Sequence, residues 1–191
     1  MHNPDSSPAH IPPSRRGLTP GTLFLGVALF GVFAVIALQM LRNNAQPITR
    51  GPAPDFSMAL YEGGEFRLSA QRGQWVVVNF WGSWCGPCRD EAPELQAAWE
   101  KYQAAGVVIV GVGFRDVESA ARQFIREYGI SYPNGNDDGL RITARYAVTG
   151  APETYVIDPD GNVQAFLLGP LPVGWLDTTL TDLMAEREAE L

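Results

Sequence analysis

The chain has 191 residues, enough for one ordinary domain and a tail, and its hydrophobic content of 46% suffices for a packed core. The formal net charge of −7 is unevenly spread: residues 1–50 carry four arginines and one aspartate, and residues 51–191 carry ten basic and twenty acidic side chains. The acidic part contains a single lysine, Lys101. It lacks the basic surface that binds phosphate backbones, so no nucleic-acid partner is expected.

The beginning of the chain predicts a tail followed by a membrane anchor. Residues 1–20 are rich in proline, serine and asparagine, and we expect a disordered cytoplasmic tail there. No residue between Arg16 and Arg42 is charged, and these 25 residues at about 1.5 Å each exceed the roughly 30 Å hydrocarbon core of a bilayer. The pattern predicts one transmembrane helix at residues 21–41.

A cleaved signal peptide is the alternative to this anchor. The apolar region of a signal peptide spans about 7 to 15 residues and precedes a cleavage site with small residues. Here the apolar stretch is longer and ends in Gln39-Met40-Leu41-Arg42, which favours an uncleaved anchor. The short N-terminal tail favours its retention in the cytoplasm. We therefore expect a single-pass protein of the cell (inner) membrane, with a linker at residues 42–53 and an extracytoplasmic domain at residues 54–191.

Strand and helix patterns alternate in the first part of this domain. The strand patterns are runs of β-branched and aromatic residues, and the helix patterns repeat apolar residues every three or four positions. This alternation implies parallel pairing of the strands. The predicted elements are strands at Trp75–Trp81 and Val107–Gly113, a helix from Pro87 to Ala105, and a helix capped by Asp116 that runs to about Tyr128.

The second part of the domain predicts a β-hairpin and a closing helix. Apolar runs at Glu153–Ile157 and at 163–168 flank the turn residues of 158–162. That Asp-Pro-Asp-Gly-Asn segment superficially suggests calcium, but it lacks the remaining ligands of a calcium loop, and turns favour the same residues. A last helix is expected from Trp175 to about Glu188. Strands between helices make an α/β layer structure.

Cys85 and Cys88 are the only cysteines of the chain, and their spacing permits a redox pair, half a zinc site or a structural bridge. A structural zinc site needs four cysteine or histidine ligands, but the only histidines, His2 and His10, precede the predicted membrane span. A bridge that closes so short a loop removes little entropy from the unfolded chain. The pair is therefore interpreted as a redox dithiol, and no metal or cofactor is expected.

The start of the predicted helix assigns unequal roles to the two cysteines. A thiolate at a helix N-terminus is stabilised by unpaired N–H groups and the helix dipole, which lower its pKa from the free value of about 8.5. Cys85 stands at this position, and Cys88 lies about one turn further in, where we expect it to be more buried. The hypothesis is that Cys85 attacks a substrate disulfide and Cys88 resolves the mixed disulfide.

The segment Phe80–Cys88, with its Trp84-Cys85-Gly86-Pro87-Cys88 core, resembles the active-site segment of the thioredoxin superfamily. Gly150–Thr154 resembles the cis-proline loop of that family. The resemblance implies that Pro152 is cis and that the loop at Gly150 and Ala151 binds the substrate chain. Trp84 stands directly before Cys85, so we expect it to shield the site and contact substrate. It also implies a three-layer α/β/α sandwich with a central mixed sheet.

The segment from Phe114 to Gly139 resembles the inserted helix segment of membrane-anchored, extracytoplasmic thioredoxins that serve cytochrome c maturation. Within that subgroup the motif at 150–154 resembles the CcmG/DsbE members, to which ResA and TlpA are related. The resemblance implies an enzyme that reduces the disulfides of apocytochrome c. It also implies re-reduction by a membrane electron donor of the CcdA/DsbD type. We expect a monomer.

The residue that could accept the proton of Cys88 must differ from the one that thioredoxin uses. Thioredoxin has a buried aspartate six residues before its first cysteine, and this chain has Asn79 there, which cannot act as a base. Glu91, three residues after Cys88 on the same helix, is the first candidate, and Glu153 beside the cis-proline is the second. The alternative is that both are solvated surface acids.

Two other functions stay open at the level of the sequence. One is a general disulfide reductase or oxidase of secreted proteins, because the sequence gives the redox couple but not its potential. The other is a non-catalytic factor that holds apocytochrome without turnover. Direct ligation of haem by imidazole is excluded outside the membrane, because no histidine follows His10.

Overall fold

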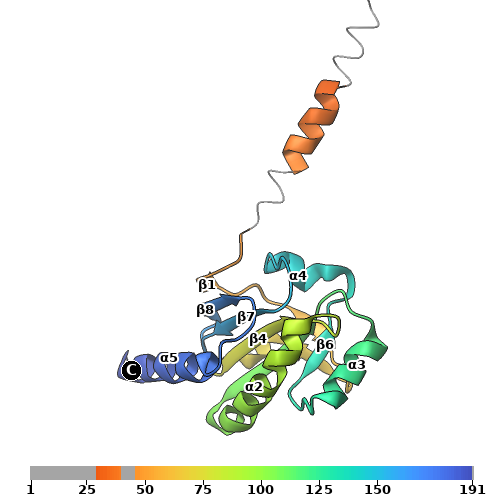
Figure 1. Cartoon of the computed structure of the whole chain (residues 1–191). Coiled ribbons are helices and arrows are strands. Elements are labelled where there is room, and N and C mark those ends of the chain that lie inside the picture. The colour runs from red at the N-terminus through yellow and green to blue at the C-terminus, as the bar shows by residue number, and fades with distance from the viewer. Residues whose placement is uncertain (1–28, 40–45, 191) are drawn as a thin grey trace, which may run out of the picture. The chain divides into compact units, whose positions relative to one another are not determined.

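The computed structural model describes residues 29–39 and 46–190, which belong to two separate units (Figure 1). Residues 29–39 form a helix whose apolar side chains are mostly exposed. Among the described residues no helix is both long and apolar enough to cross a bilayer. The predicted tail at 1–20 lies outside the described residues, and so do both ends of the predicted span at 21–41.

The unit that contains residues 46–190 is built around a mixed six-stranded sheet with the order β1-β8-β7-β4-β5-β6 (Figure 1). Strands β4, β5 and β6 run parallel, and β7, β8 and β1 are joined to them by antiparallel pairing. The strands are β1 (Gly51–Pro52), β4 (Trp75–Trp81), β5 (Val107–Gly113), β6 (Asn134–Asn136), β7 (Glu153–Ile157) and β8 (Asn162–Leu168).

The helices cover the two faces of this sheet unequally. The larger apolar cluster packs α2 (Gly86–Tyr102), α3 (Glu118–Glu127) and α5 (Trp175–Glu190) against one face. The other face is covered by the short helix α4 (Arg141–Arg145) and by a hairpin. The remaining elements are the hairpin strands β2 (Ser57–Ala59) and β3 (Glu65–Arg67) and the 3-10 helices η1 (Leu68–Gln71), η2 (Gln103–Ala105) and η3 (Asp138–Leu140).

Strand β4 delivers the cysteines and also one polar side chain to the interior. All seven of its residues are buried, as the apolar pattern predicts. Because successive side chains of a strand point to opposite faces, Asn79 shares a face with Val77 and Trp81. Those two residues belong to the cluster under α2. An amide therefore lies in the apolar layer between the sheet and the helix that begins with the cysteine pair.

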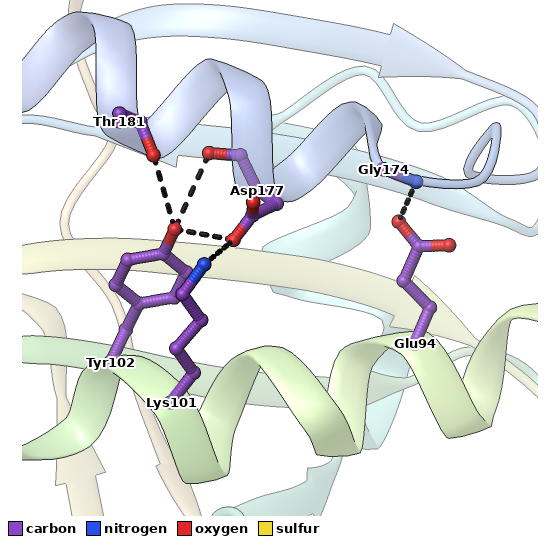
Figure 2. A network of polar contacts seen from close by, with 6 residues as sticks. All are labelled: Glu94, Lys101, Tyr102, Gly174, Asp177 and Thr181. Atoms are coloured by element: carbon purple, nitrogen blue, oxygen red, sulfur yellow. Dashed lines mark hydrogen bonds and ion pairs between the residues drawn. The ribbon is translucent and has the colours of Figure 1, made fainter.

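Polar contacts join the C-terminal end of α2 to α5, as Figure 2 shows. The hydroxyl of Tyr102 contacts the Asp177 carboxylate and lies 3.1 Å from the Thr181 Oγ1, and Lys101 forms an ion pair with Asp177. Nearer the cysteines, the Glu94 Oε1 accepts a 2.9 Å hydrogen bond from the backbone N–H of Gly174. These contacts hold the helix of the cysteines against the chain that leads into α5.

Several predicted boundaries differ from the structure in detail. Gly51 and Pro52, at the end of the expected linker, pair with β8 because the sheet edge offers free backbone groups there. The β2–β3 hairpin was not predicted, since its strands are only three residues long. The hairpin at 153–168 is confirmed: the Asp158 carboxylate accepts from the backbone and side chain of Asn162 and from Gln164, as a turn residue does.

Candidate active site

Cys85 and Cys88 form a disulfide at the N-terminus of α2, so the structure is that of the oxidised protein. Cys85 is the N-cap residue in an extended conformation, and the backbone N–H of Cys88 donates to its Sγ over 3.2 Å. After reduction a thiolate on Cys85 would accept this bond at the positive end of the helix dipole. The predicted difference in burial is not present in the oxidised form, where both side chains are at most 3% exposed.

The loop before β7 faces the disulfide. The Ala151–Pro152 peptide bond is cis, as the resemblance implied, and the Ala151 carbonyl oxygen lies 3.4 Å from the Cys85 Sγ. The carbonyl of Pro152 accepts from the Gly169 N–H over 2.9 Å. The backbone of Ala151 is thus held next to the sulfur that a substrate must reach.

Glu153 is completely buried and holds this loop in shape. Its Oε1 accepts from the backbone N–H and the hydroxyl of Thr149, at 2.8 and 3.0 Å, and from the backbone N–H of Gly150 at 3.2 Å. The Tyr155 hydroxyl lies 3.5 Å from its other oxygen. These donors all belong to the chain around the cis-proline. The contacts support a role in positioning Ala151, and a role as proton acceptor stays a prediction.

Glu91 is 2% exposed and lies on α2 three residues after Cys88. Its Oε1 accepts from the Asn79 Nδ2 and its Oε2 from the backbone N–H of Leu171, both at 2.9 Å. Burial raises the pKa of Glu91 to about 7, and the negative charge of Glu94 contributes to the rise. The two hydrogen bonds lower the pKa but do not cancel the effect of burial. A carboxyl group with this pKa can accept or release a proton at neutral pH. The alternative of two solvated surface acids is excluded, because Glu91 and Glu153 are both buried.

Trp84 stands at the rim of the site with half of its side chain exposed. Its Nε1 donates to the carbonyls of Phe114 and Arg115, each at 3.1 Å, and its ring lies 6.0 Å from the Phe114 ring. The indole is therefore fixed by its N–H edge, while part of the ring is free to contact another protein. The position agrees with contact to substrate rather than with complete shielding of the disulfide.

The prediction that Asp116 caps α3 is wrong. The helix begins at Glu118 after Val117, and no side chain caps it. The Asp116 carboxylate instead accepts from the Ser83 hydroxyl at 2.7 Å and from the backbone N–H of Ser83. This contact ties the loop before the cysteines to the end of β5. Sequence reasoning missed it because the two residues are separated by 33 positions.

Sequence reasoning also missed the partners of Glu91. Asn79 was interpreted as the loss of a base, and its position in an otherwise apolar strand was the available signal that its amide has a buried partner. Leu171 offered no such signal, because the contribution is its backbone N–H. The structure brings together Cys85, Cys88 and Ala151, with the cis Pro152 beside Ala151 and with Glu153 bound to Thr149 and Gly150 of the same loop. Glu91 lies one helix turn after Cys88, and its hydrogen-bond partners are Asn79 and Leu171.

Comparison with known proteins identifies the family. The model of the AhpC/TSA family matches residues 49–166. The thiol-disulfide oxidoreductase ResA of Geobacillus kaustophilus is 34% identical over 157 residues, which cover 82% of this chain and 90% of that protein. The chain belongs to the AhpC/TSA family. The prediction of a thioredoxin-like thiol-disulfide oxidoreductase is confirmed by this relationship.

Solved structures agree with this assignment. A thiol:disulfide interchange protein of the thioredoxin family from Chlorobium tepidum has a TM-score of 0.62 and 29% identity, covering 71% of this chain and 94% of its own. A secreted Mycobacterium tuberculosis disulfide oxidoreductase, described as homologous to E. coli DsbE, has a TM-score of 0.56 and 27% identity, covering 71% and 96%. The chain is therefore an oxidoreductase of the ResA and DsbE type with the thioredoxin fold.

The raised pKa of Glu91 predicts how the stability of the oxidised protein depends on pH. Between the ordinary carboxyl value of 4.5 and about 7, the folded protein keeps a proton that the unfolded chain has lost. The free energy of unfolding therefore falls as the pH rises through this interval, by about 3 kcal/mol from this one group. Chemical denaturation at a series of pH values should show this decline in the wild type and lose it in Glu91→Gln.

Glu100→Gln is the matched control, because Glu100 is exposed on the same helix. It should keep the decline. A Glu91→Gln protein with the pH dependence of the wild type would contradict the raised pKa.

Proposed function

We propose that this oxidoreductase works as an extracytoplasmic reductant that reduces the disulfides of apocytochrome c during cytochrome c maturation. The observation that supports assisted proton transfer at the dithiol is the buried Glu91 carboxyl, with a pKa of about 7, on the helix turn that follows Cys88. A base at this position serves the step in which the second thiol loses its proton. That step occurs when the dithiol reduces a substrate, and the protonated carboxyl serves the reverse step, so the reducing direction itself rests on the resemblance to thioredoxins that serve cytochrome c maturation.

The reaction uses the two cysteines and the carboxylate in sequence. The Cys85 thiolate attacks one sulfur of the substrate disulfide, the substrate S–S bond breaks, and the first substrate sulfur leaves as a thiolate. Cys88 then gives its proton to Glu91 and attacks the Cys85 Sγ, which expels the second substrate sulfur. Two electrons pass to the substrate, the two released thiolates take up protons, and the Cys85–Cys88 disulfide is formed.

Substrate binding is assigned to the loop and the indole that border Cys85. The Ala151 backbone, 3.4 Å from the Cys85 Sγ at its carbonyl oxygen, would pair with the extended backbone of a substrate on either side of its cysteine. Gly150 and the cis Pro152 keep that backbone accessible, with Glu153 holding the loop from below. The exposed part of the Trp84 ring would contact apolar side chains of the substrate.

We assign the protein to the cell membrane, with its catalytic domain outside the cytoplasm. The uncharged stretch between Arg16 and Arg42 and the exposed apolar helix at residues 29–39 support a single-pass anchor. The similarity to a secreted oxidoreductase supports the extracytoplasmic side. Re-reduction of the Cys85–Cys88 disulfide then requires a membrane electron donor, for which a protein of the CcdA/DsbD type is proposed.

Substitution of the resolving cysteine should trap the substrate. In Cys88→Ser the mixed disulfide on Cys85 cannot be resolved, so it accumulates in cells that express the full chain. Mass spectrometry of the trapped complexes should find c-type apocytochromes as the main partners. The matched control is Cys85→Ser, which lacks the attacking sulfur and should trap none of them. Complexes dominated by other secreted proteins would contradict the cytochrome role and favour a general disulfide reductase.

The reduction potential should be that of a reductant. Equilibration of the wild-type protein with glutathione or dithiothreitol should give a value nearer to that of thioredoxin, about −270 mV, than to that of DsbA, about −120 mV. The reason is that a protein which reduces the disulfides of other proteins must hold its electrons less tightly than they do, which a potential near that of DsbA would not allow. A value near that of DsbA would contradict the reducing direction and indicate an oxidase.

A further inference from the structure

The side-chain amide of Asn79 is buried, so it can interact only with the groups that it contacts directly. Its side chain belongs to a residue that is 1% exposed, in the middle of β4. The two hydrogens of its Nδ2 have two acceptors, the Glu91 Oε1 at 2.9 Å and the Thr154 Oγ1 at 3.0 Å. Both donor positions of the amide are therefore used, and one of them meets the carboxylate on the helix of the cysteines.

The sheet fixes the direction in which this amide points. Asn79 pairs with Gly111 on β5 and with Thr154 on β7. A β-carbon at Gly111 would collide with the Asn134 Oδ1, so the space beside Asn79 on β5 is too closely packed for any side chain at position 111. On the other side, Thr154 follows the cis-proline loop by two residues. The amide thus connects Glu91 to the strand that presents Ala151 and Pro152.

We propose that Asn79 is a positioning residue for the reduction reaction, because its amide holds the Glu91 carboxylate in the orientation that receives the proton of Cys88. This inference rests on the proposed function, in which Glu91 is the proton acceptor. Glu91 lies on α2, and the amide of Asn79 on β4 holds its carboxylate in place. Asn79 therefore carries a role of its own, although it cannot act as a base.

The charges around Glu91 explain why its carboxylate depends on neutral hydrogen-bond donors. The titratable groups whose charge is coupled to Glu91 are Glu94 on α2 and the buried hydroxyl of Tyr132 beyond β5. From β4 and the loop before α5, its hydrogen-bond partners are the uncharged Asn79 amide and the Leu171 N–H, and from β7 Thr154 binds the same amide. No cation faces the carboxylate among the described residues. Two hydrogen bonds are then its main stabilisation, and a carboxylate at position 79 would repel it.

Removal of the Asn79 amide should shift the pH dependence of the resolving step. Loss of one hydrogen bond to the charged form raises the pKa of Glu91, so the carboxylate becomes available only at higher pH. The step can be followed with 5,5′-dithiobis(2-nitrobenzoate) on the reduced full chain. The first thionitrobenzoate is released by Cys85 and the second, in a first-order phase, by Cys88. In Asn79→Ala the midpoint of the second phase should rise by about one pH unit, and its rate at pH 6.5 should fall about tenfold.

The same change in a Glu91→Gln background separates a positioning role from a structural one. If Asn79 acts through Glu91, Asn79→Ala has no further effect on the pH profile of Glu91→Gln. An equal effect in both backgrounds would overturn the inference. A Glu91→Gln profile that equals that of the wild type would instead overturn the proton acceptor of the proposed function. Asn162→Ala, which removes an amide bound to a carboxylate in the distant turn, is the control and should keep the wild-type midpoint.

Asn79→Asp provides the same test if Asn79→Ala does not fold. The substituted aspartate is nearly isosteric with asparagine and places a second carboxylate beside Glu91. The two carboxylates must share a proton, so the midpoint of the second phase again rises. The double variant Asn79→Asp with Glu91→Gln exchanges the acid and the amide. It should regain a carboxylate-dependent midpoint that Glu91→Gln lacks. An unchanged midpoint in Asn79→Asp would overturn the inference.

Discussion

A carboxylate inside a protein needs donors or cations in place of water, and in this chain the donors to Glu91 come from two separate elements. Asn79 on β4 serves one oxygen of Glu91, and the backbone of Leu171 in the loop before α5 serves the other. Burial still outweighs these bonds, so the pKa of Glu91 rises to about 7. The sheet, helix α2 and the final loop must all be in place for this group to titrate near neutral pH. In the proposed reaction, transfer of the Cys88 proton depends on that arrangement.

The fold places the remaining parts of the site around the same helix. Strand β4 ends directly before the cysteines, and α2 begins with Cys85 as its N-cap residue. The cis-proline loop leads into β7, which pairs antiparallel with β4, so the start of β7 lies beside the end of β4 and the Ala151 carbonyl lies next to the Cys85 Sγ. Glu94 binds the N–H of Gly174, one turn of α2 beyond Glu91 (Figure 2). The loop before α5 is thus held by two carboxylates of the active-site helix.

Much of this arrangement follows from local patterns, and the rest depends on contacts across the fold. Strand β4, helix α2 and the hairpin at β7 and β8 are predicted because their apolar periods and turn residues are local properties of the chain. The roles of Cys85, Cys88 and Pro152 follow from motifs at fixed spacing. The function of Asn79 does not, because its meaning depends on Glu91 twelve positions later and Thr154 seventy-five positions later. Asp116 was misinterpreted for the same reason: a capping residue and a partner for Ser83 look alike in sequence.

The central claim is that Glu91 is a buried proton carrier for the Cys85–Cys88 couple. The most direct test is the titration of the Glu91 carboxyl carbon itself, followed by nuclear magnetic resonance in the oxidised protein with carbon-13 in its glutamates and assigned with Glu91→Gln. The account predicts a midpoint at about 7 for this carboxyl. A midpoint at the ordinary value of 4.5 would show an unperturbed acid and would contradict the account.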